Sequence, residues 1–173
     1  MFTVPLGAMC LAAAIVKGAC PFLESLNLSN CEIQNRGFGK IIHGFKISKI
    51  KSITNLNLRN NFLTYKSLEY FKESMGSGIF RDLAYLDLSD NELGDKGVSV
   101  LTRLVINGDL KNIVVINLKR NRISDIGFTV IVKVFRFLKE QKCPFLEKIF
   151  LEGNQISAKS KNQFGTLPLF YSL

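Results

Sequence analysis

Apolar residues recur at fixed intervals along the chain and divide it into copies of one unit. Five stretches follow the pattern Leu-x-x-Leu-x-Leu-x-x-Asn-x-Ile, with Ile and Leu interchangeable, and successive copies are 30, 30, 30 and 33 residues apart. Within each copy, apolar and polar residues alternate over the central positions, as Leu86 and Leu88 alternate with Asp87 and Ser89. A period of two over so few residues predicts a short strand with one buried face.

A second apolar pattern follows each strand at helical spacing. We number this pattern from a glycine or serine that recurs once in each unit and call it the reference residue. The residues one, four and eight positions after it are apolar in every unit. Polar residues fill the intervening positions, so the pattern is typical of a helix with one buried face. Each unit is therefore predicted to be a strand followed by a helix, and the reference residues are Gly7, Gly37, Ser67, Gly97 and Gly127.

Repetition of this unit predicts an overall architecture. Crossovers of the type strand, helix, strand are right-handed, so the strands should lie parallel in one sheet with all helices in a second layer. Neighbouring strands lie about 4.8 Å apart, whereas packed helices need about 8 to 10 Å. The array should therefore curve with the sheet inside. The expected fold is α/β: a right-handed solenoid, or horseshoe, with a parallel concave sheet and convex helices.

The repeat resembles that of the leucine-rich repeat family over nearly the whole chain. The resemblance is carried by the apolar positions of the five Leu-x-x-Leu-x-Leu-x-x-Asn-x-Ile copies and by the asparagine or cysteine in each copy: Cys31, Asn61, Asn91, Asn121 and Asn154. Repeats of about 30 residues that contain a helix are similar to those of the intracellular ribonuclease-inhibitor-like class. The expected organisation is one array over 1–173, with a half repeat at 1–22, repeats at 23–52, 53–82, 83–112, 113–145 and 146–166, and a C-terminal cap at 167–173.

The asparagine column is expected to be structural. Where the chain turns inward after each strand, buried backbone groups need partners, and a carboxamide can both donate and accept. Stacked amides would form a ladder from repeat to repeat, and Cys31 would occupy its end as a buried thiol that donates a hydrogen bond.

The apolar run at residues 4–16 matches the helix positions of a repeat whose strand is absent. It is too short to span a membrane, which needs about 20 apolar residues, and no basic segment of a signal peptide precedes it. The predicted strand at 24–29 then has a neighbour on one side only. We expect this end to be covered by another chain, by upstream repeats or by self-association.

Composition and charge narrow the functional classes. The chain is 47% hydrophobic and 21% charged, which argues against intrinsic disorder. The four cysteines lack disulfide-cap or zinc-site spacing, so we expect free thiols, no metal or cofactor, and a reducing, cytoplasmic location. The single histidine, His43, falls on an exposed helix position. No set of catalytic residues emerges, and we expect the protein not to be an enzyme.

Candidate binding residues lie on the outward positions of the strands. The array should present them on its concave face as an ordered grid that packing leaves free. Most of the net charge of +9 lies elsewhere, on helices and connections. Basic residues on a repeat helix usually form only its solvent-exposed face. The candidate concave contacts are Arg59, Tyr85, Asp87, Asn117, Lys119, Lys148 and Phe150, and the candidate basic patch is Lys40, Lys46, Lys49, Lys133, Arg136 and Lys139.

Three functions are compatible with this pattern. The favoured one is a non-catalytic module that binds a partner protein on its concave face. The alternative is a structural subunit of a large assembly, such as a ribonucleoprotein, docked through the basic helical side; nucleic acid is less favoured because aromatic residues do not alternate with these lysines on an exposed face. The third, regulation of a small GTPase, rests on the resemblance in repeat class alone, since the chain lacks the larger repeat number and acidic tail expected of that group.

Overall fold

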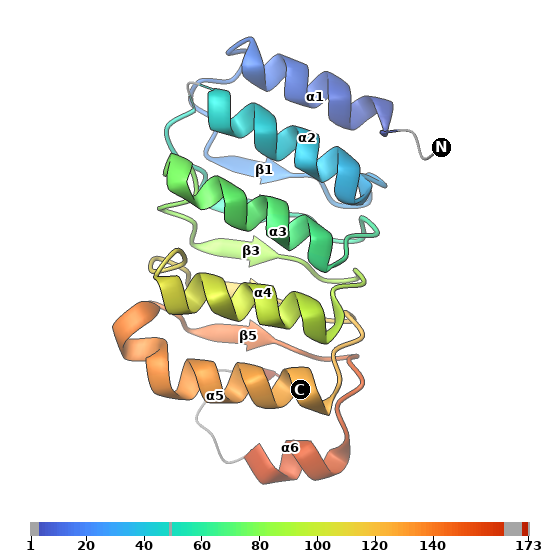
Figure 1. Ribbon diagram of the computed structural model, residues 1–173, viewed down its shortest axis with the longest axis vertical. Coiled ribbons are helices and arrows are strands. Elements are labelled where there is room, and N and C mark those ends of the chain that lie inside the picture. The colour runs from blue at the N-terminus through green and yellow to red at the C-terminus, as the bar shows by residue number, and fades with distance from the viewer. Residues whose placement is uncertain (1–3, 49, 165–170, 173) are drawn as a thin grey trace.

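The structure, a computed structural model, describes residues 4–48, 50–164 and 171–172, and forms two layers (Figure 1). The strands are β1 (Ser25–Asn27), β2 (Asn55–Asn57), β3 (Tyr85–Asp87), β4 (Val115–Asn117), β5 (Lys148–Phe150) and β6 (Tyr171–Ser172). The helices are α1 (Leu6–Val16), α2 (Gln34–Ile47), α3 (Tyr65–Ser74), α4 (Gly94–Asn107), α5 (Asp125–Lys142) and α6 (Ala158–Phe164), with the short 3-10 helix η1 (Met75–Ser77) after α3.

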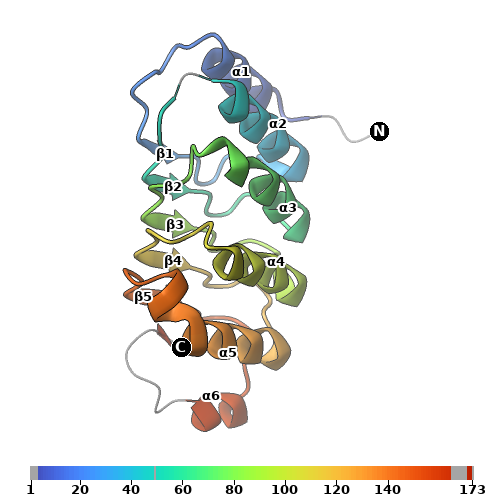
Figure 2. The same ribbon diagram turned by 60° about the vertical axis from the view of Figure 1, so that its left-hand side comes forward.

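All six strands belong to one parallel sheet in the order β1-β2-β3-β4-β5-β6. Equivalent positions of successive repeats lie opposite each other, because each repeat adds one strand in the same phase. The central residues pair in the order Leu26, Leu56, Leu86, Ile116 and Ile149. The helices follow the same order in the second layer, on one side of the sheet (Figure 2). The chain therefore has an α/β repeat fold.

The core lies between the two layers and is built from the predicted apolar positions. The residues one position after the reference residues are all buried: Ala8, Phe38, Leu68, Val98 and Phe128. At the N-terminal end, by contrast, Leu11, Leu26 and Leu28 are only partly buried. Leu11 lies in α1, Leu26 in β1 and Leu28 just after β1; among the described elements, α1 and β1 have a neighbour in their layer on one side only.

Four phenylalanine rings form the aromatic part of this core. Phe80 lies at its centre, with its ring centroid 4.7 Å from that of Phe71 and 5.8 Å from that of Phe45. Phe38 completes the group, 6.4 Å from Phe71. Phe80 is outside the predicted strand and helix positions. It belongs to a further buried column five residues before the start of β2, β3, β4 and β5: Ile50, Phe80, Leu110 and Cys143.

The strands and the C-terminal tail differ from the prediction. Each of the first five strands has three residues, so β1 is shorter than the predicted 24–29. Of the predicted cap at 167–173, residues 167–170 and 173 lie outside the described residues. Tyr171 and Ser172 form β6, which pairs in parallel with β5 and adds a sixth strand to the sheet. The tail lacks the repeat pattern, so sequence periodicity could not predict this strand.

Candidate functional site

The sheet face, meaning the surface of the sheet that points away from the helices, carries two rows of side chains. The first row is Ser25, Asn55, Tyr85, Val115 and Lys148, and the second is Asn27, Asn57, Asp87, Asn117 and Phe150. Small polar residues occupy the rows on β1 and β2. On β3 and β5 the rows hold an aromatic and a charged residue each, and β4 between them carries Val115 and Asn117.

The polar residues of the second row bond to their own turns. The side-chain oxygens of Asn27, Asn57, Asp87 and Asn117 each accept a hydrogen bond from the backbone N–H two residues further on, at 2.8 to 3.2 Å. Asparagine and aspartate favour this local turn because their short side chains reach that N–H without strain. The second row therefore shapes the strand ends, which sequence periodicity did not reveal.

Asp87 was predicted as an exposed contact residue, but its carboxylate is largely buried. The residue is only 7% exposed. Its Oδ1 accepts from the Ser89 hydroxyl at 2.6 Å, and its Oδ2 accepts from the Asn117 amide at 3.1 Å. The register of β3 and β4 brings the amide within reach, so the carboxylate is satisfied inside the sheet.

Tyr85 remains accessible beside this carboxylate. It is 36% exposed, in the first row next to Val115. Partial burial, and to a lesser degree the negative charge of Asp87, raise the pKa of the Tyr85 hydroxyl above its usual value. Tyr85 therefore offers a neutral hydroxyl and one edge of an aromatic ring, a combination common in protein interfaces.

Two lysines lie against the Phe150 ring on the C-terminal part of the sheet face. The ammonium groups of Lys119 and Lys148 each lie 4.7 Å from the centre of its ring. Lys119 also pairs with Glu152 at 3.3 Å. Within the described part of the chain, Lys148 has no carboxylate within ion-pair distance. The exposed Lys148 and the partly buried Phe150 and Lys119 thus form an aromatic and cationic group.

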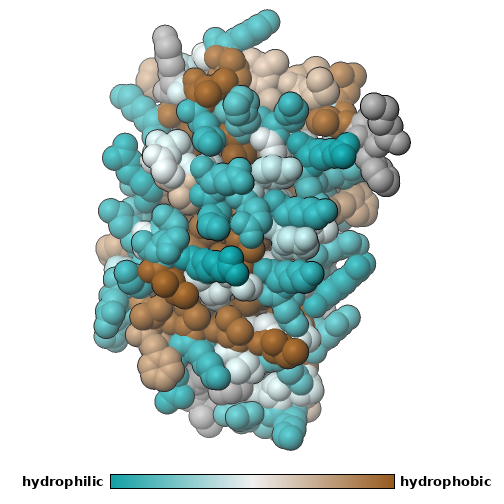
Figure 3. Space-filling model, viewed as in Figure 1, coloured by the Kyte–Doolittle hydropathy of each residue, from teal (hydrophilic) through white to brown (hydrophobic). Residues whose placement is uncertain are grey.

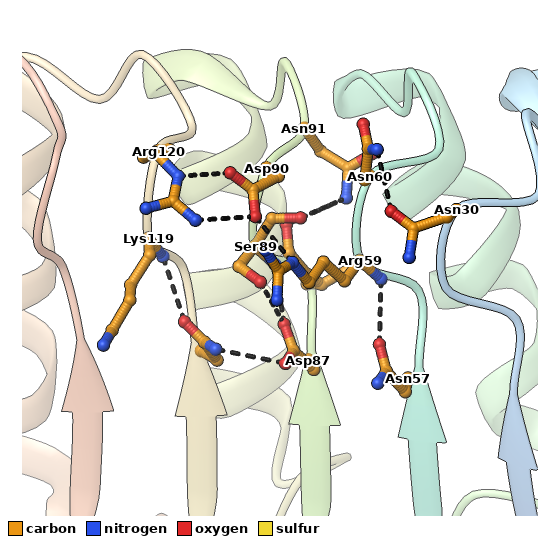
Figure 4. A network of polar contacts seen from close by, with 12 residues as sticks. Asn30, Asn57, Arg59, Asn60, Asp87, Ser89, Asp90, Asn91, Lys119 and Arg120 are labelled. Carbon is orange, nitrogen blue, oxygen red and sulfur yellow. Dashed lines mark hydrogen bonds and ion pairs between the residues drawn. The ribbon is translucent and has the colours of Figure 1, made fainter.

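Asp90 holds two arginines where the strands end (Figure 4). Its carboxylate accepts from Arg59 Nε at 2.7 Å and from two nitrogens of Arg120, with Nη2 at 2.9 Å. The Arg120 hydrogen bonds, followed by those of Arg59, keep the pKa of the Asp90 carboxyl below its usual value, although partial burial opposes this. The carboxylate therefore links three repeats at neutral pH, and Arg59 is already paired within the fold.

The strand exits share an unusual backbone conformation. Each has a positive φ, between 49° and 73°, at equivalent positions of the five repeats: Asn30, Asn60, Asp90, Arg120 and Gly153. Asparagine, aspartate and glycine tolerate this region, but arginine rarely adopts it. Gly153 leaves room for Arg120, because a Cβ at that position would lie 2.5 Å from Arg120 Cγ.

The asparagine column joins the backbones of neighbouring repeats. Asn91 is 4% exposed, and its Oδ1 accepts from the N–H groups of Asn61 and Leu63 at 3.0 and 2.9 Å. Its Nδ2 donates to three backbone carbonyls, those of Leu58, Leu88 and Ser89, each at 3.0 Å. Asn61, Asn121 and Asn154 make similar bonds. These bonds run from each amide to backbone groups of its own and the preceding repeat.

Cys31, the first member of the column, differs from the expectation. The residue is exposed, where a buried thiol was predicted. Its Sγ lies 3.3 Å from the Ser29 carbonyl, within its own turn. Among the described strands, β1 is the edge of the sheet, so no described strand lies next to this turn on its outer side. The Cys31 backbone N–H donates to Asn61 Oδ1 at 3.1 Å.

A second set of bonds between repeats lies at the helix starts and was not predicted. Asn35 and Asp95 are the second residues of α2 and α4, and Asp125 is the first residue of α5. Their Oδ1 atoms accept from the backbone N–H of the residue that precedes the next helix: Thr64 at 2.9 Å, Ser124 at 2.9 Å and Ser157 at 2.8 Å. The signal in the sequence is an Asn or Asp that recurs with the repeat, followed about 30 residues later by Ser or Thr.

The predicted basic patch is split into two groups. Lys40 and Lys46 are exposed on α2, and Lys133 and Arg136 are exposed on α5. Helices α3 and α4 lie between them (Figure 1), so the four side chains do not form one continuous surface. Lys49 and the side chain of Lys139 lie outside the described residues.

The four cysteines differ in environment. Cys10, Cys20 and Cys31 are exposed, whereas Cys143 is fully buried and its Sγ lies 3.3 Å from the Leu110 carbonyl. Burial raises the pKa of the Cys143 thiol from 9.0 to about 11. The unfolded thiol would ionise first, so its stabilising effect is present below about pH 9 and is lost as the pH rises toward 11.

Alkylation should separate these thiols. At pH 8 we expect iodoacetamide to label Cys10, Cys20 and Cys31 and to label Cys143 at least about 100-fold more slowly, because two pKa units remove that much thiolate and burial excludes the reagent. Peptide mass spectrometry with and without urea measures the rates. Equal labelling of all four cysteines in the folded protein would contradict the buried environment of Cys143.

Other chemistry is sparse in the described part of the chain. No helix there is long and apolar enough to cross a membrane. The same residues contain no group of three or more histidine, cysteine, aspartate or glutamate side chains that could hold a metal ion. His43 is exposed on α2.

Comparison with protein families finds two matching places. A family model described as "Leucine Rich repeat" matches residues 19–41, which include β1 and the start of α2, and residues 81–101, which include β3 and the start of α4. A search of curated proteins finds no match to the chain. Both matched places contain a strand, the turn after it and the beginning of a helix. Together with five copies of this unit in one register, the two matches support a leucine-rich repeat protein.

Proposed function

We propose that the protein is a non-catalytic, cytoplasmic interaction module that binds a partner protein on its sheet face. The proposal takes the array to be an arc of a horseshoe-shaped solenoid of the ribonuclease-inhibitor-like class, with the sheet face on its concave side. The observation that carries it is a group of residues on β3 to β5 that are neighbours in the sheet register: Tyr85 and Lys148 are exposed, and Val115 and Phe150 are partly exposed.

The chemistry of this group indicates the kind of contact. Aromatic residues and cations are enriched where protein interfaces gain most of their affinity. Lys148 has a free ammonium beside the Phe150 ring, so a carboxylate of the partner could pair with it. The bonds within each repeat and between repeats hold the group on a rigid frame, which lowers the entropy lost on binding.

Two other functions have weaker support. A structural subunit docked through its basic helical side would gain from a continuous basic surface, whereas the described lysines and arginine form separate groups on α2 and α5. Regulation of a small GTPase has no support in the described residues beyond the repeat class.

A triple substitution tests the proposal. Tyr85→Ala, Lys119→Ala and Phe150→Ala together should weaken partner binding by at least about 100-fold, because each contributes exposed contact area, while circular dichroism stays unchanged. Partners are captured from native extract with the wild-type chain, identified by mass spectrometry, and their affinities are measured by calorimetry. Lys40→Glu with Lys46→Glu is the control on the opposite layer.

The outcomes separate the alternatives. Binding that survives the triple substitution but fails in the α2 control would contradict the sheet-face proposal and favour docking through the helical side. Loss of the captured material after nuclease treatment would favour the ribonucleoprotein assembly.

The N-terminal end of the array is proposed to be covered by a further polypeptide. In α1, Leu6, Met9 and Val16 are 75%, 48% and 45% exposed, and β1 pairs only with β2 among the described strands. A second copy of the chain would cover both the apolar helix and the open strand edge. We expect the isolated chain to self-associate in sedimentation, or residues 24–29 to exchange amide hydrogens faster than residues 84–89. A monomer with equal protection would contradict this.

A further inference from the structure

Helix α5 differs from the preceding helices on its outer surface. Ile126, Val130, Val134 and Phe137 recur every three to four residues along it and so lie on one side of the helix. We call these four residues the α5 stripe. At the position of Ile126, the earlier helices α2, α3 and α4 carry only basic residues: Arg36, Lys66 and Lys96. In α1 the equivalent residue is Leu6, so an exposed apolar residue at this position is found in α1 and α5 and not in the three helices between them, and the repeat pattern itself does not require it.

The α5 stripe is exposed to solvent at both ends. Ile126 and Phe137 are each 72% exposed, while Val130 and Val134 between them are partly buried against the core. Ile106, at the end of neighbouring α4, is 45% exposed. Figure 3 shows brown side chains gathered over α4 and α5, further brown and tan side chains at the top over α1, and mostly teal side chains between them. Core packing does not account for the exposed Ile126 and Phe137 side chains.

Positive charge accompanies the stripe. Arg103 on α4, and Lys133 and Arg136 on α5, are all exposed. Among the nearby acidic residues, Asp95 and Asp125 accept hydrogen bonds from Ser124 and Ser157, and Glu140 is exposed on α5 one turn after Arg136. The three exposed basic residues outnumber the one exposed glutamate beside the stripe, so its complement is an apolar strip with acidic residues beside it.

We propose that the α5 stripe binds an amphipathic helix of a partner protein, with apolar residues at helical spacing flanked by aspartate or glutamate. From Ile126 to Phe137 the stripe extends about 16 Å at 1.5 Å per residue, which matches three turns of a docked helix. Side chains of such a helix can reach the recessed Val130 and Val134, because packed helices interlock their side chains. A flat lipid surface would meet mainly the two projecting ends, which makes a helix the better complement.

The site is separate from the proposed sheet-face site, since it lies on the other layer of the fold (Figure 2). The two sites could therefore be occupied together, and variants of one should leave the other intact. This separation supplies the controls for the test.

A displayed library of helical peptides tests the proposal. The peptides carry fixed leucines at positions i, i+3, i+4, i+7 and i+11, with Asp, Glu, Lys, Arg, Ser and Gln varied at the flanking positions. Selection uses the wild-type chain, with counter-selection on an Ile126→Ser, Phe137→Ser variant, whose exposed positions should leave folding unchanged in thermal unfolding. Enriched peptides should carry Asp or Glu at the flanks.

Affinities of the enriched peptides decide the outcome. By fluorescence anisotropy, we expect at least a tenfold loss for Ile126→Ser with Phe137→Ser and for Lys133→Glu with Arg136→Glu, and no change for Tyr85→Ala with Phe150→Ala. Absence of enrichment, basic or random flanks, or equal affinity for all variants would overturn the proposal. Binding to phosphatidylcholine vesicles containing phosphatidylserine that is lost in the Ile126 and Phe137 variant, without peptide enrichment, would assign the stripe to a membrane surface instead.

Discussion

Replacing Phe80 by alanine is expected to lower the free energy of unfolding by about 4 kcal/mol, the middle of the range for a buried phenylalanine. Phe80 is 1% exposed, and its ring contacts both Phe45 and Phe71, which come from two different repeats. The cavity would therefore open where helices α2 and α3 and the approach to β3 meet. Urea unfolding followed by circular dichroism measures the loss.

Phe145→Ala is the matched control for this substitution. Phe145 is 60% exposed and precedes a strand in the fifth repeat, so its loss should change the free energy of unfolding by less than about 0.5 kcal/mol. Equal effects of the two substitutions would show that Phe80 does not anchor the core.

Asn91→Ala is expected to lower the free energy of unfolding by about 3 kcal/mol. The substitution leaves two buried backbone N–H groups and three carbonyls without the partner that Asn91 provides. Each unsatisfied buried group costs about 1 to 3 kcal/mol, and rearrangement of the turn recovers part of the total. Thermal unfolding should show a midpoint lower by about 6 to 12 °C.

Asn55→Ala provides the control for the asparagine column. Asn55 is exposed on β2, and its side-chain amide bonds only to the neighbouring Thr54 hydroxyl, at 3.1 Å. We expect a change of less than about 0.5 kcal/mol. The Asn91→Ala variant should still bind a sheet-face partner with wild-type affinity at temperatures where it is folded. An unchanged thermal unfolding midpoint for Asn91→Ala would contradict the structural role proposed for the asparagine column.

Much of the fold could be predicted from the chain alone. Burial requires apolar side chains at regular positions, so the spacing of Leu56, Leu86 and Ile116 identified the strands, and that of Phe38, Ile41 and Phe45 identified a helix face. Parallel order followed because each strand is succeeded by a helix. The N-terminal apolar run was placed as a repeat helix, in agreement with α1.

The candidate site was predicted less completely. Periodicity correctly assigned Tyr85, Lys148 and Phe150 to the surface of the sheet, but it treated every outward residue as equally available. Asp87 proved to be buried by bonds to Ser89 and Asn117, and Cys31 proved to be exposed. Both differences depend on which side chain stands in the adjacent repeat, or on whether a repeat is there at all.

Local periodicity is enough to predict the repeat unit, the order of its strands and helices, and the face on which each residue lies. Which side chains meet became visible only in the folded chain, where Arg59 and Arg120 pair with Asp90, and Asp95 and Asp125 bond to the residue before the next helix. Such contacts join residues about 30 positions apart. They depend on distance, rotamer and competing hydrogen bonds, which periodicity does not report.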